Sequence, residues 1–431
     1  MKTRLLVVLA VFGLLVPACT GGSNDGGSST GGALPSGPVT LTFWHGYSDY
    51  EADWLNGAID QWNKENPDIQ IDPLYVNNDN ALQKLTVALQ GGEPPDITYQ
   101  YGSSLAEVAG APGLVNLSDW VQRPDVNWDD FIPGARSAAT FEGKVLGIPA
   151  LVDNLAIVYN KTLFDQAGMD YPSADWTWDD FRAAAKALTD PAAKQFGFAY
   201  PMDASEDSVW HWDPLLWQNG GSILNGDNTQ AEFNSPEGVE ALQVFTGMAV
   251  DDQSVFLDIQ NSAYTNIFNS GRIAMLETGP WDLPSFPDVD YGVEILPGFN
   301  GDHQTIAGPD MWCVFDNGGG RAQAALKFIQ WLTAPEQIKQ EDLATGHLPI
   351  RLSVAQDSAF DKQFGKAWPG VDTFVENLSN VDQARPVLAA YPAISTAMGS
   401  AIVSAMLGQS EPQAALDQAA SEANDALSLA G

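Results

Sequence analysis

The sequence contains little cysteine and little histidine. Two cysteines and four histidines occur in 431 residues. Cys313 stands in the apolar run Met311–Phe315, whereas Cys19 follows an N-terminal apolar segment, so no disulfide is expected and Cys313 is predicted to be a buried thiol. The scattered histidines and the lack of a cysteine pair give no support to a structural zinc site. We therefore expect no metal and no other cofactor.

The chain is also poor in basic residues. It has 19 lysines and arginines against 55 aspartates and glutamates, which gives a formal net charge of −36 at pH 7. Lysine and arginine are the residues that bind the phosphates of nucleic acids and anionic lipids, so this balance opposes both kinds of partner. It also argues against a polyanionic ligand. We therefore expect no nucleic-acid partner.

Long apolar runs, internal repeats and catalytic motifs are missing as well. Beyond the N-terminal segment no run approaches 18 consecutive apolar residues, so no transmembrane helix is predicted. No repeat of about 20–50 residues indicates a solenoid. Gly-x-Ser-x-Gly, P-loop and His-Glu-x-x-His motifs do not occur, and we expect no enzyme. A secreted glycoside hydrolase remains an alternative, because it needs only two carboxyl groups about 5 or 7–9 Å apart.

The N-terminus has the pattern of an export signal. Lys2 and Arg4 precede the apolar run Leu5–Val16, which is too short to span a bilayer and fits a signal-peptide core. The run ends in Ala18-Cys19, which resembles the bacterial lipoprotein box, in which the cysteine is acylated. We predict a signal peptide over 1–18 and lipidation of Cys19. The alternative is an ordinary secretory signal with an incidental cysteine.

A slack segment follows the predicted lipid site. Thr20–Pro38 consists almost entirely of Gly, Ser, Thr, Asn, Asp and Pro, so it cannot bury a core and is predicted to be a flexible linker over 19–38. Such a chain reaches roughly 25 Å. We therefore expect a folded part that stands off the membrane, attached only through its lipid anchor, at the cell surface or on the periplasmic side of the cytoplasmic membrane.

The remaining chain predicts a two-domain α/β protein. About 390 residues exceed a comfortable single core. Segments typical of strands, such as Val39–Phe43, alternate with segments typical of helices. The first such helix follows a capping box at Ser48–Glu51 and places Leu55, Ile59 and Trp62 on one face. The C-terminal 75 residues are rich in alanine and predicted to be helical.

Short motifs in a fixed order carry a resemblance to a known family. The motifs are Phe43–Gly46, Gly91–Ile97, Gly143–Pro149 with Tyr159–Phe164, Trp217–Gly221, Phe233–Glu237, Gly271–Met275 with Gly279–Trp281, and Gly346–Arg351. Through them the chain resembles the extracellular solute-binding proteins of ABC importers, specifically the sugar-binding group that includes maltodextrin, trehalose and glycerol-phosphate receptors. The resemblance runs along nearly all of residues 39–431.

The resemblance implies a two-lobed periplasmic-binding-protein (Venus-flytrap) fold of class II type, with a ligand cleft between the lobes. The first lobe is expected from 39–150 plus 306–352, and the second from 155–300 plus 357–431. Hinge crossings are expected near 150–154, 296–308 and 352–356. The implied function is capture of a mono- or oligosaccharide and its delivery, by lobe closure, to the subunits of a cognate ABC permease. We expect a monomer.

Candidate ligand contacts combine aromatic and polar side chains. A sugar ring has an apolar face that an aromatic plate covers, and a rim of hydroxyls that carboxylates, amides and arginine satisfy. The Gly279-Pro280 and Gly308-Pro309 pairs are read as turns beside such residues. The candidates are Trp44, His45, Tyr101, Asp153, Asn154, Trp212, Glu277, Trp281, Asp310, Trp312 and Arg351. Core packing remains the alternative for each.

Two of these assignments are sharper than the rest. At least two of Trp44, Trp281 and Trp312 are predicted to line the cleft, with Trp281 as an anchor, because the family places an aromatic residue at its position against the sugar. Arg351 matches a family position near the ligand and could pair an anion. It therefore leaves glycerol-phosphate open as an alternative ligand, together with a polyol or a small peptide.

Overall fold

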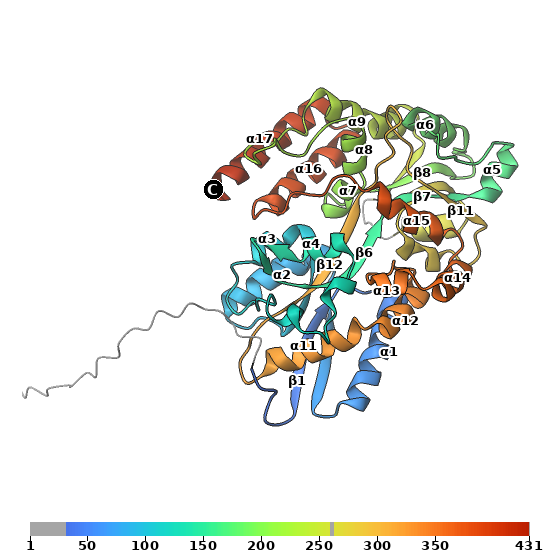
Figure 1. The fold of residues 1–431 in the computed structure, drawn as a ribbon. Helices are drawn as coiled ribbons and strands as arrows, with labels where there is room; N and C mark the ends of the chain where they lie inside the picture. Colours follow the sequence, from blue (N-terminus) through green and yellow to red (C-terminus); the bar gives the residue numbers. More distant parts are fainter. Residues whose placement is uncertain (1–31, 259–262, 431) are drawn as a thin grey trace, which may run out of the picture.

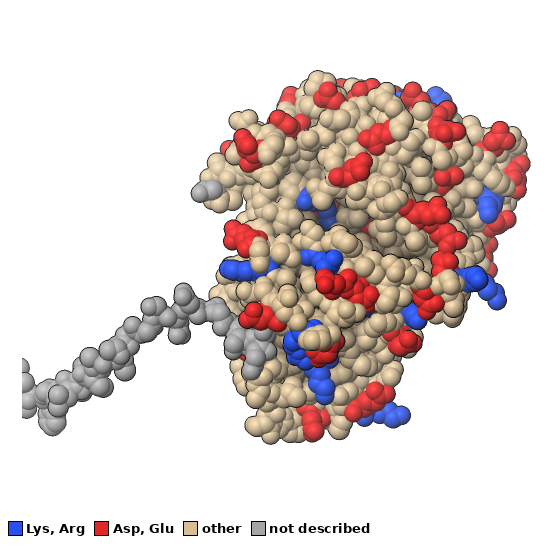
Figure 2. Space-filling model, in the orientation of Figure 1, with Lys and Arg blue, Asp and Glu red and all other residues tan. Residues whose placement is uncertain are grey.

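The computed structural model describes residues 32–258 and 263–430, and they form two five-stranded sheets with helices around them (Figure 1). The predicted signal peptide, Cys19 and most of the predicted linker lie outside the described residues. Within the described part of the chain, no helix is long and apolar enough to cross a bilayer. Acidic side chains are spread over the visible face of both lobes, in keeping with the net charge (Figure 2).

The first sheet joins strands from three distant parts of the chain. Its order is β2(Ile69–Tyr75), β1(Val39–His45), β3(Ile97–Tyr101), β12(Ala307–Val314) and β6(Ile148–Asn154). β1 runs parallel to β2 and β3, whereas β12 runs antiparallel to β3 and β6. Every residue of β6 is buried, as expected of a strand covered on both faces.

The second sheet is built from the middle of the chain. Its order is β11(Tyr291–Glu294), β7(Ala156–Asn160), β10(Ile273–Thr278), β8(Phe196–Pro201) and β9(Val255–Asp258). β10 is parallel to β8 and antiparallel to β7, and β8 is parallel to β9. The two sheets therefore define two lobes, which we call the first and the second lobe.

Helices cover the faces of both sheets. The first lobe carries α1(Asp49–Glu65), α2(Asn78–Gly91), α3(Leu105–Val108), α4(Pro133–Ala138), α11(Arg321–Leu332) and α12(Pro335–Thr345), with the small hairpin β4(Thr140–Phe141)–β5(Lys144–Val145). The second carries α5(Lys161–Ala167), α6(Trp178–Ala187), α7(Glu206–Trp210), α8(Asp213–Gln218), α9(Pro236–Thr246), α10(Tyr264–Asn269), α16(Tyr391–Met406) and α17(Pro412–Ala430). Three further helices, α13(Leu352–Ala355), α14(Ser358–Ala367) and α15(Val371–Asn377), follow α12 of the first lobe and precede α16 of the second lobe in sequence.

The sequence pattern of α1 explains how this helix forms and packs. The Glu51 carboxylate accepts a hydrogen bond from the Ser48 backbone N–H at 3.3 Å, which satisfies a donor that the helix cannot pair internally. Leu55, Ile59 and Trp62 are buried on one face, as the spacing predicts. The predicted helical C-terminus is also found: α16 and α17 pack against each other on the second lobe (Figure 1).

The two lobes are joined where β6 passes directly into β7. Asn154 ends β6, and its amide donates to the Phe374 carbonyl oxygen at 2.8 Å. The Leu155 carbonyl oxygen accepts from the Thr305 hydroxyl at 2.7 Å and from the Asn377 amide at 3.0 Å. Three passages of the chain therefore lie side by side at this point. The expected crossing near 352–356 stays a prediction, since α13 and α14 contact α12, whereas α15 contacts β6 and β11.

Candidate ligand-binding site

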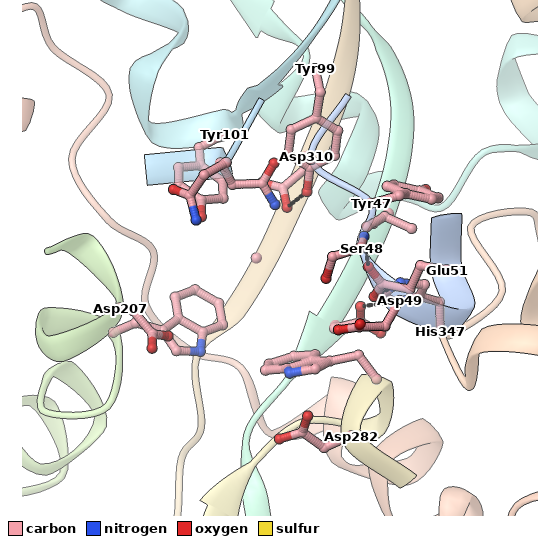
Figure 3. A pocket seen from close by; sticks show the side chains of 18 of the residues that line it. Tyr47, Ser48, Asp49, Glu51, Tyr99, Tyr101, Asp207, Asp282, Asp310 and His347 are labelled. Atoms are coloured by element: carbon pink, nitrogen blue, oxygen red, sulfur yellow. Dashed lines mark hydrogen bonds and ion pairs between the residues drawn. The ribbon is translucent and has the colours of Figure 1, made fainter. Parts of the chain in front are cut away.

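A cavity of about 370 Å³ lies between the lobes. The first lobe contributes the loop after β1 with the start of α1, the ends of β3 and β6, the start of β12, and the loop after α12. The second lobe contributes α7, the start of α10 and the turn η5(Pro280–Ser285), and the segment before α16 adds Arg385. Figure 3 shows Tyr101 and Asp310 of the first lobe, and Asp207 and Asp282 of the second, around the same space. The cavity thus forms where strands of the first sheet end, which is the usual place for a ligand crevice in an α/β fold.

Four of the eleven predicted site residues line this cavity: Tyr101, Asp153, Trp281 and Asp310. They come from β3, β6, η5 and β12, so elements far apart in sequence bring them together. Whether each of them contacts a ligand stays a prediction.

Trp281 reaches the cavity because Gly279, two residues before it, has no side chain. β10 ends at Thr278, Gly279 follows it, and Pro280 opens η5, as the turn signal predicts. A Cβ on Gly279 would lie 1.9 Å from the Trp281 indole, so the ring rests directly on the glycine backbone. The Trp281 carbonyl oxygen also accepts a hydrogen bond from the Tyr50 hydroxyl of the first lobe. The indole is therefore fixed at the seam between the lobes.

Asp310 carries a carboxylate with unused hydrogen-bonding capacity. Its Oδ2 accepts from the Tyr99 hydroxyl at 2.5 Å, whereas its buried Oδ1 has no hydrogen-bond partner among the described residues. Burial raises the pKa of Asp310 to about 7. A buried acceptor of this kind costs free energy unless a donor meets it, which is a role that a ligand can fill.

The structure corrects the expectation for Trp312 and Trp44. Gly308 and Pro309 do not form a turn but lie inside β12, where they pair with β6, so the cavity edge falls at Asp310 and Trp312 lies deeper in the lobe. Trp312 is 2% exposed and packs 4.9 Å from Phe43, centroid to centroid. Trp44 faces the opposite side of its strand, where the Lys84 amine lies 4.9 Å from its ring centroid. Of the three tryptophans, only Trp281 lines the cavity.

Five other candidates also lie away from the cavity lining. His45 is buried at the end of β1, and desolvation lowers its pKa to about 4, so it is neutral. Asn154 is engaged at the lobe connection described above. Trp212 is fully buried in the second-lobe core, and Glu277 is buried on β10, 3.9 Å from the ring of His211.

Arg351 is the fifth, and its guanidinium is already occupied. It lies 3.9 Å from the Phe131 ring centroid, donates to the Thr333 carbonyl oxygen and forms an ion pair with Asp130 at 3.3 Å. The family-based expectation that it lies near the ligand, where it could pair an anion, is therefore corrected.

The structure adds residues to the site that the sequence reasoning missed. They include Tyr47, Ser48, Asp49, Tyr50, Glu51, Tyr99, Glu206, Asp207, Trp210, Asp282, His347 and Arg385. The capping box that follows β1 was a usable signal, because ligands bind beyond the ends of strands. Trp210 stands in the aromatic cluster from which Trp212 was chosen, but Trp210 ends α7 at the cavity, whereas Trp212 precedes α8 and is buried in the second-lobe core. Arg385 had no signal, since only the fold brings it here.

His347 connects α1 to β6 at the edge of the cavity. Its Nδ1 lies 2.6 Å from Asp153 Oδ2 and its Nε2 lies 3.1 Å from Glu51 Oε1. Burial opposes a charge on the ring, but the two carboxylates outweigh it and raise the pKa of His347 well above 6.5. His347 is therefore an imidazolium at neutral pH, with both nitrogens donating.

On the second-lobe side, Trp210 is held from two directions. The Arg385 guanidinium lies 4.6 Å from its ring centroid and forms an ion pair with Glu206 at 2.5 Å. A Cβ on Gly308 would lie 2.7 Å from the same indole, so β12 leaves just enough room for it. Trp210 and Trp281 are thus two fixed aromatic surfaces on the same wall.

The charge of the cavity is dominated by carboxylates. Seven of them line it: Asp49, Glu51, Asp153, Glu206, Asp207, Asp282 and Asp310. The two cationic side chains in the lining, His347 and Arg385, are both bonded to carboxylates. Asp282 is 6% exposed and accepts from the Thr278 hydroxyl at 2.6 Å, and burial raises its pKa to about 7. The site therefore offers hydrogen-bond acceptors and aromatic faces, and it opposes a negative charge.

Among the described residues, no group of three or more His, Cys, Asp or Glu side chains is arranged to hold a metal ion. The lining side chains offer hydrogen bonds, aromatic faces and charge.

Comparison with known proteins shows extensive similarity. A family model of the bacterial extracellular solute-binding proteins matches residues 48–339. The sn-glycerol-3-phosphate-binding periplasmic protein of Pectobacterium atrosepticum is 24% identical over 405 residues, which cover 89% of this chain and 90% of that protein.

Solved structures extend the similarity to the fold. The cyclic α-maltosyl-1,6-maltose binding protein from Arthrobacter globiformis is 29% identical with a TM-score of 0.73, and an ABC substrate-binding protein from Listeria monocytogenes in complex with cycloalternan is 27% identical with a TM-score of 0.82. Each comparison covers 91% of this chain and 99% of the other. The expected two-lobed periplasmic-binding-protein fold is therefore confirmed.

Proposed function

The chain belongs to the bacterial extracellular solute-binding proteins, and from that premise we propose that it captures an oligosaccharide outside the cytoplasmic membrane for an ABC permease. Binding between two lobes favours the closed arrangement, so the ligand shifts a conformational population and undergoes no chemistry. The permease then receives the loaded, closed form.

The composition of the cavity walls is the observation that carries this proposal. Aromatic side chains come from both lobes, with Tyr47, Tyr99 and Tyr101 on one side and Trp210 and Trp281 on the other. Carboxylates lie among them, so the apolar faces and the hydroxyl rim of a sugar both find partners. The volume of about 370 Å³ falls in the range of roughly 300–1,000 Å³ that is typical of small-molecule sites.

The similar solved structures support a carbohydrate ligand. The Arthrobacter globiformis protein is named for a cyclic maltosyl-maltose, and the Listeria monocytogenes protein is in complex with cycloalternan. An oligosaccharide is therefore the first candidate, and a polyol or a small peptide is kept as an alternative.

A glycerol-phosphate ligand is the second candidate, because the Pectobacterium relative is named for it. Arginine and lysine are the usual side-chain donors to a phosphate. The cationic side chains of the cavity lining are His347 and Arg385, and both already bond to carboxylates. A negative ligand would also face the remaining carboxylates, so this candidate is the weaker one.

A thermal-shift panel tests the proposal. A ligand that binds only the folded state raises the melting temperature. We expect a shift with neutral or basic saccharides and none with glycerol 3-phosphate or glycerophosphodiesters. Chromatography of the bound sugar after long incubation should recover it unaltered. A shift caused by phosphorylated ligands alone would contradict the choice of ligand, and accumulating hydrolysis product would support a glycoside hydrolase instead.

We further propose that the protein is a monomer tethered by a lipid on Cys19 after removal of a signal peptide over 1–18. The support is the apolar run that ends in Ala18-Cys19 and the slack segment behind it. Cys19→Ala is expected to release the exported protein into the soluble fraction. Retention of an acylated variant at the membrane would place the anchor elsewhere.

A further inference from the structure

We infer that the ligand of this cavity is a basic saccharide, one that carries a protonated amine recognised by Asp282 and Asp310. The inference rests on the proposed function, since it specifies the class of saccharide at the same site. Four observations lead to it: the carboxylates that lack an ion pair, their distribution over both lobes, the engagement of both cationic side chains, and the aromatic surfaces beside them.

Three of the lining carboxylates have no ion-pair partner among the described residues. Asp49, Asp282 and Asp310 form none, whereas Glu51 and Asp153 share His347, and Glu206 pairs with Arg385. The remaining lining carboxylate is Asp207, which lies 3.6 Å from the buried ring of His211. After every pairing within the described residues is made, Asp49, Asp282 and Asp310 are left without a cationic partner in the cavity.

The uncompensated carboxylates come from both lobes. Asp49 starts α1 and Asp310 lies on β12 in the first lobe, whereas Asp282 lies on η5 in the second. Figure 3 shows Asp49, Asp282 and Asp310 on different sides of the same space. Bringing these groups together when the lobes close raises their mutual repulsion in a partly desolvated volume. A cation between them would remove that opposition to closure.

Both acidic groups named in the inference are placed to receive a donor that carries charge. Asp310 Oδ1 is buried and has no hydrogen-bond partner among the described residues, while Tyr99 holds the other oxygen. Asp282 is buried beside Trp281, with Asp207 and Glu51 close enough to disfavour its ionised form. A sugar hydroxyl would supply a hydrogen bond only, whereas an ammonium supplies three donors and the compensating charge.

The groups around these carboxylates do not supply that charge. The Tyr99 hydroxyl, the Gly102 backbone, Arg385 and Asp153 act on Asp310, and Arg385, the one cation of this set, is already paired with Glu206. Thr278, Tyr264, Asp207 and Glu51 act on Asp282, and none of them is a cation. Trp210, Trp281 and Tyr101 add aromatic faces, which attract a cation as well as a sugar ring.

Matched pairs of sugars test the inference. Isothermal titrations at pH 7 would compare glucose with glucosamine, galactose with galactosamine, and cellotriose with fully deacetylated chitotriose. N-acetylglucosamine and triacetylchitotriose serve as neutral controls of similar size. For at least one pair, the basic sugar is expected to bind about tenfold or more tightly than its neutral counterpart, because a charge-assisted hydrogen bond replaces a neutral one.

Two variants locate the effect. Asp282→Asn and Asp310→Asn keep the side-chain shape but remove the charge, and at least one of them should reduce the advantage of the basic sugar below about threefold. Asp60→Asn, an exposed change on α1 outside the cavity, should leave it intact. Neutral sugars that bind as tightly as basic ones would overturn this inference and leave the proposed function standing. Absence of binding by every sugar would overturn the proposed function as well.

Discussion

The two walls of the cavity are built on different principles. The first-lobe wall is held by polar contacts: Glu51 and Asp153 clamp His347, and the Tyr47 hydroxyl donates to Glu341 at 2.6 Å. The second-lobe wall presents two indoles, Trp210 and Trp281, on short elements that glycine backbones support.

Both walls carry aromatic rings and carboxylates, but the first lobe contributes tyrosines and a hydrogen-bonded clamp, whereas the second lobe contributes two indoles. Each wall forms only one side of the cavity, so a ligand that contacts both walls must lie between the lobes. Binding at this site therefore depends on the lobes being together, which is the physical basis of a closure-coupled receptor.

The largest effect is expected on stability, from a change in the core that lies behind the first-lobe wall. Trp312→Ala should lower the free energy of unfolding by about 3–5 kcal/mol, because the buried indole leaves a cavity between Phe43, Tyr47 and Tyr99. Urea unfolding followed by circular dichroism measures it. A change below about 1 kcal/mol would mean that the packing beneath this wall is loose, and the contrast with the second wall would fail.

The second-largest effect is expected from a change of His347, which Glu51 and Asp153 hold in the first-lobe wall. His347→Gln should cost about 1.5–3 kcal/mol of unfolding free energy, because it removes a cation that is hydrogen-bonded to Glu51 and Asp153. The pKa of His347 is raised in the folded state, so its contribution is complete below about pH 6.5 and declines as the pH rises toward the raised pKa. The difference between wild type and variant should therefore shrink as pH rises above about 6.5.

Unfolding curves measured between pH 5 and 9 give that difference directly. Trp281→Ala is the matched control, since it removes no titratable group and its difference from wild type should not follow this profile. A His347→Gln difference that is constant across the series would show that the ring is not an imidazolium held by two carboxylates.

For the second wall, the effect should appear in binding and not in folding. Trp281→Ala should weaken saccharide binding by about 1–3 kcal/mol, which is roughly 5- to 150-fold in Kd, because an indole plate is lost from the ligand. The unliganded melting temperature should change little, since the ring rests on Gly279 at the cavity edge. Unchanged affinity together with a melt lowered by several degrees would make Trp281 a packing residue and would break the comparison.

The smallest effect on ligand affinity is expected from a change that shifts the Trp210 indole without removing it. Gly308→Ala places a methyl group 2.7 Å from the Trp210 indole, so the ring must shift while its chemistry is kept. We expect Kd to rise by up to about tenfold, equivalent to about 1.4 kcal/mol, in the same titrations. Gly57→Ala is a suitable control, because a Cβ there meets nothing within 4 Å. Equal effects of the two variants would show that the position of Trp210 does not matter.

Much of the architecture was accessible from sequence because it depends on local patterns. The alternation of strand and helix signals predicted an α/β chain, the capping box at Ser48–Glu51 marked the start of α1, and the alanine-rich C-terminus predicted helices that α16 and α17 confirm. The ordered motifs predicted the family, which is confirmed. The excess of acidic residues, read from composition as opposing nucleic-acid and polyanionic partners, is visible on the surface of both lobes in Figure 2.

The position of each site side chain was decided by the tertiary structure. The sequence does not distinguish a tryptophan that packs in a core from one that lines a cavity. The register of β12 decides that Asp310 lines the cavity and that Trp312 packs in the core. Arg385 reaches Trp210 and Glu206 although about 175 residues separate them in sequence. Burial and pairing across such distances depend on how whole elements pack, whereas the sequence by itself determines composition, local periodicity and the signals that begin and end each element.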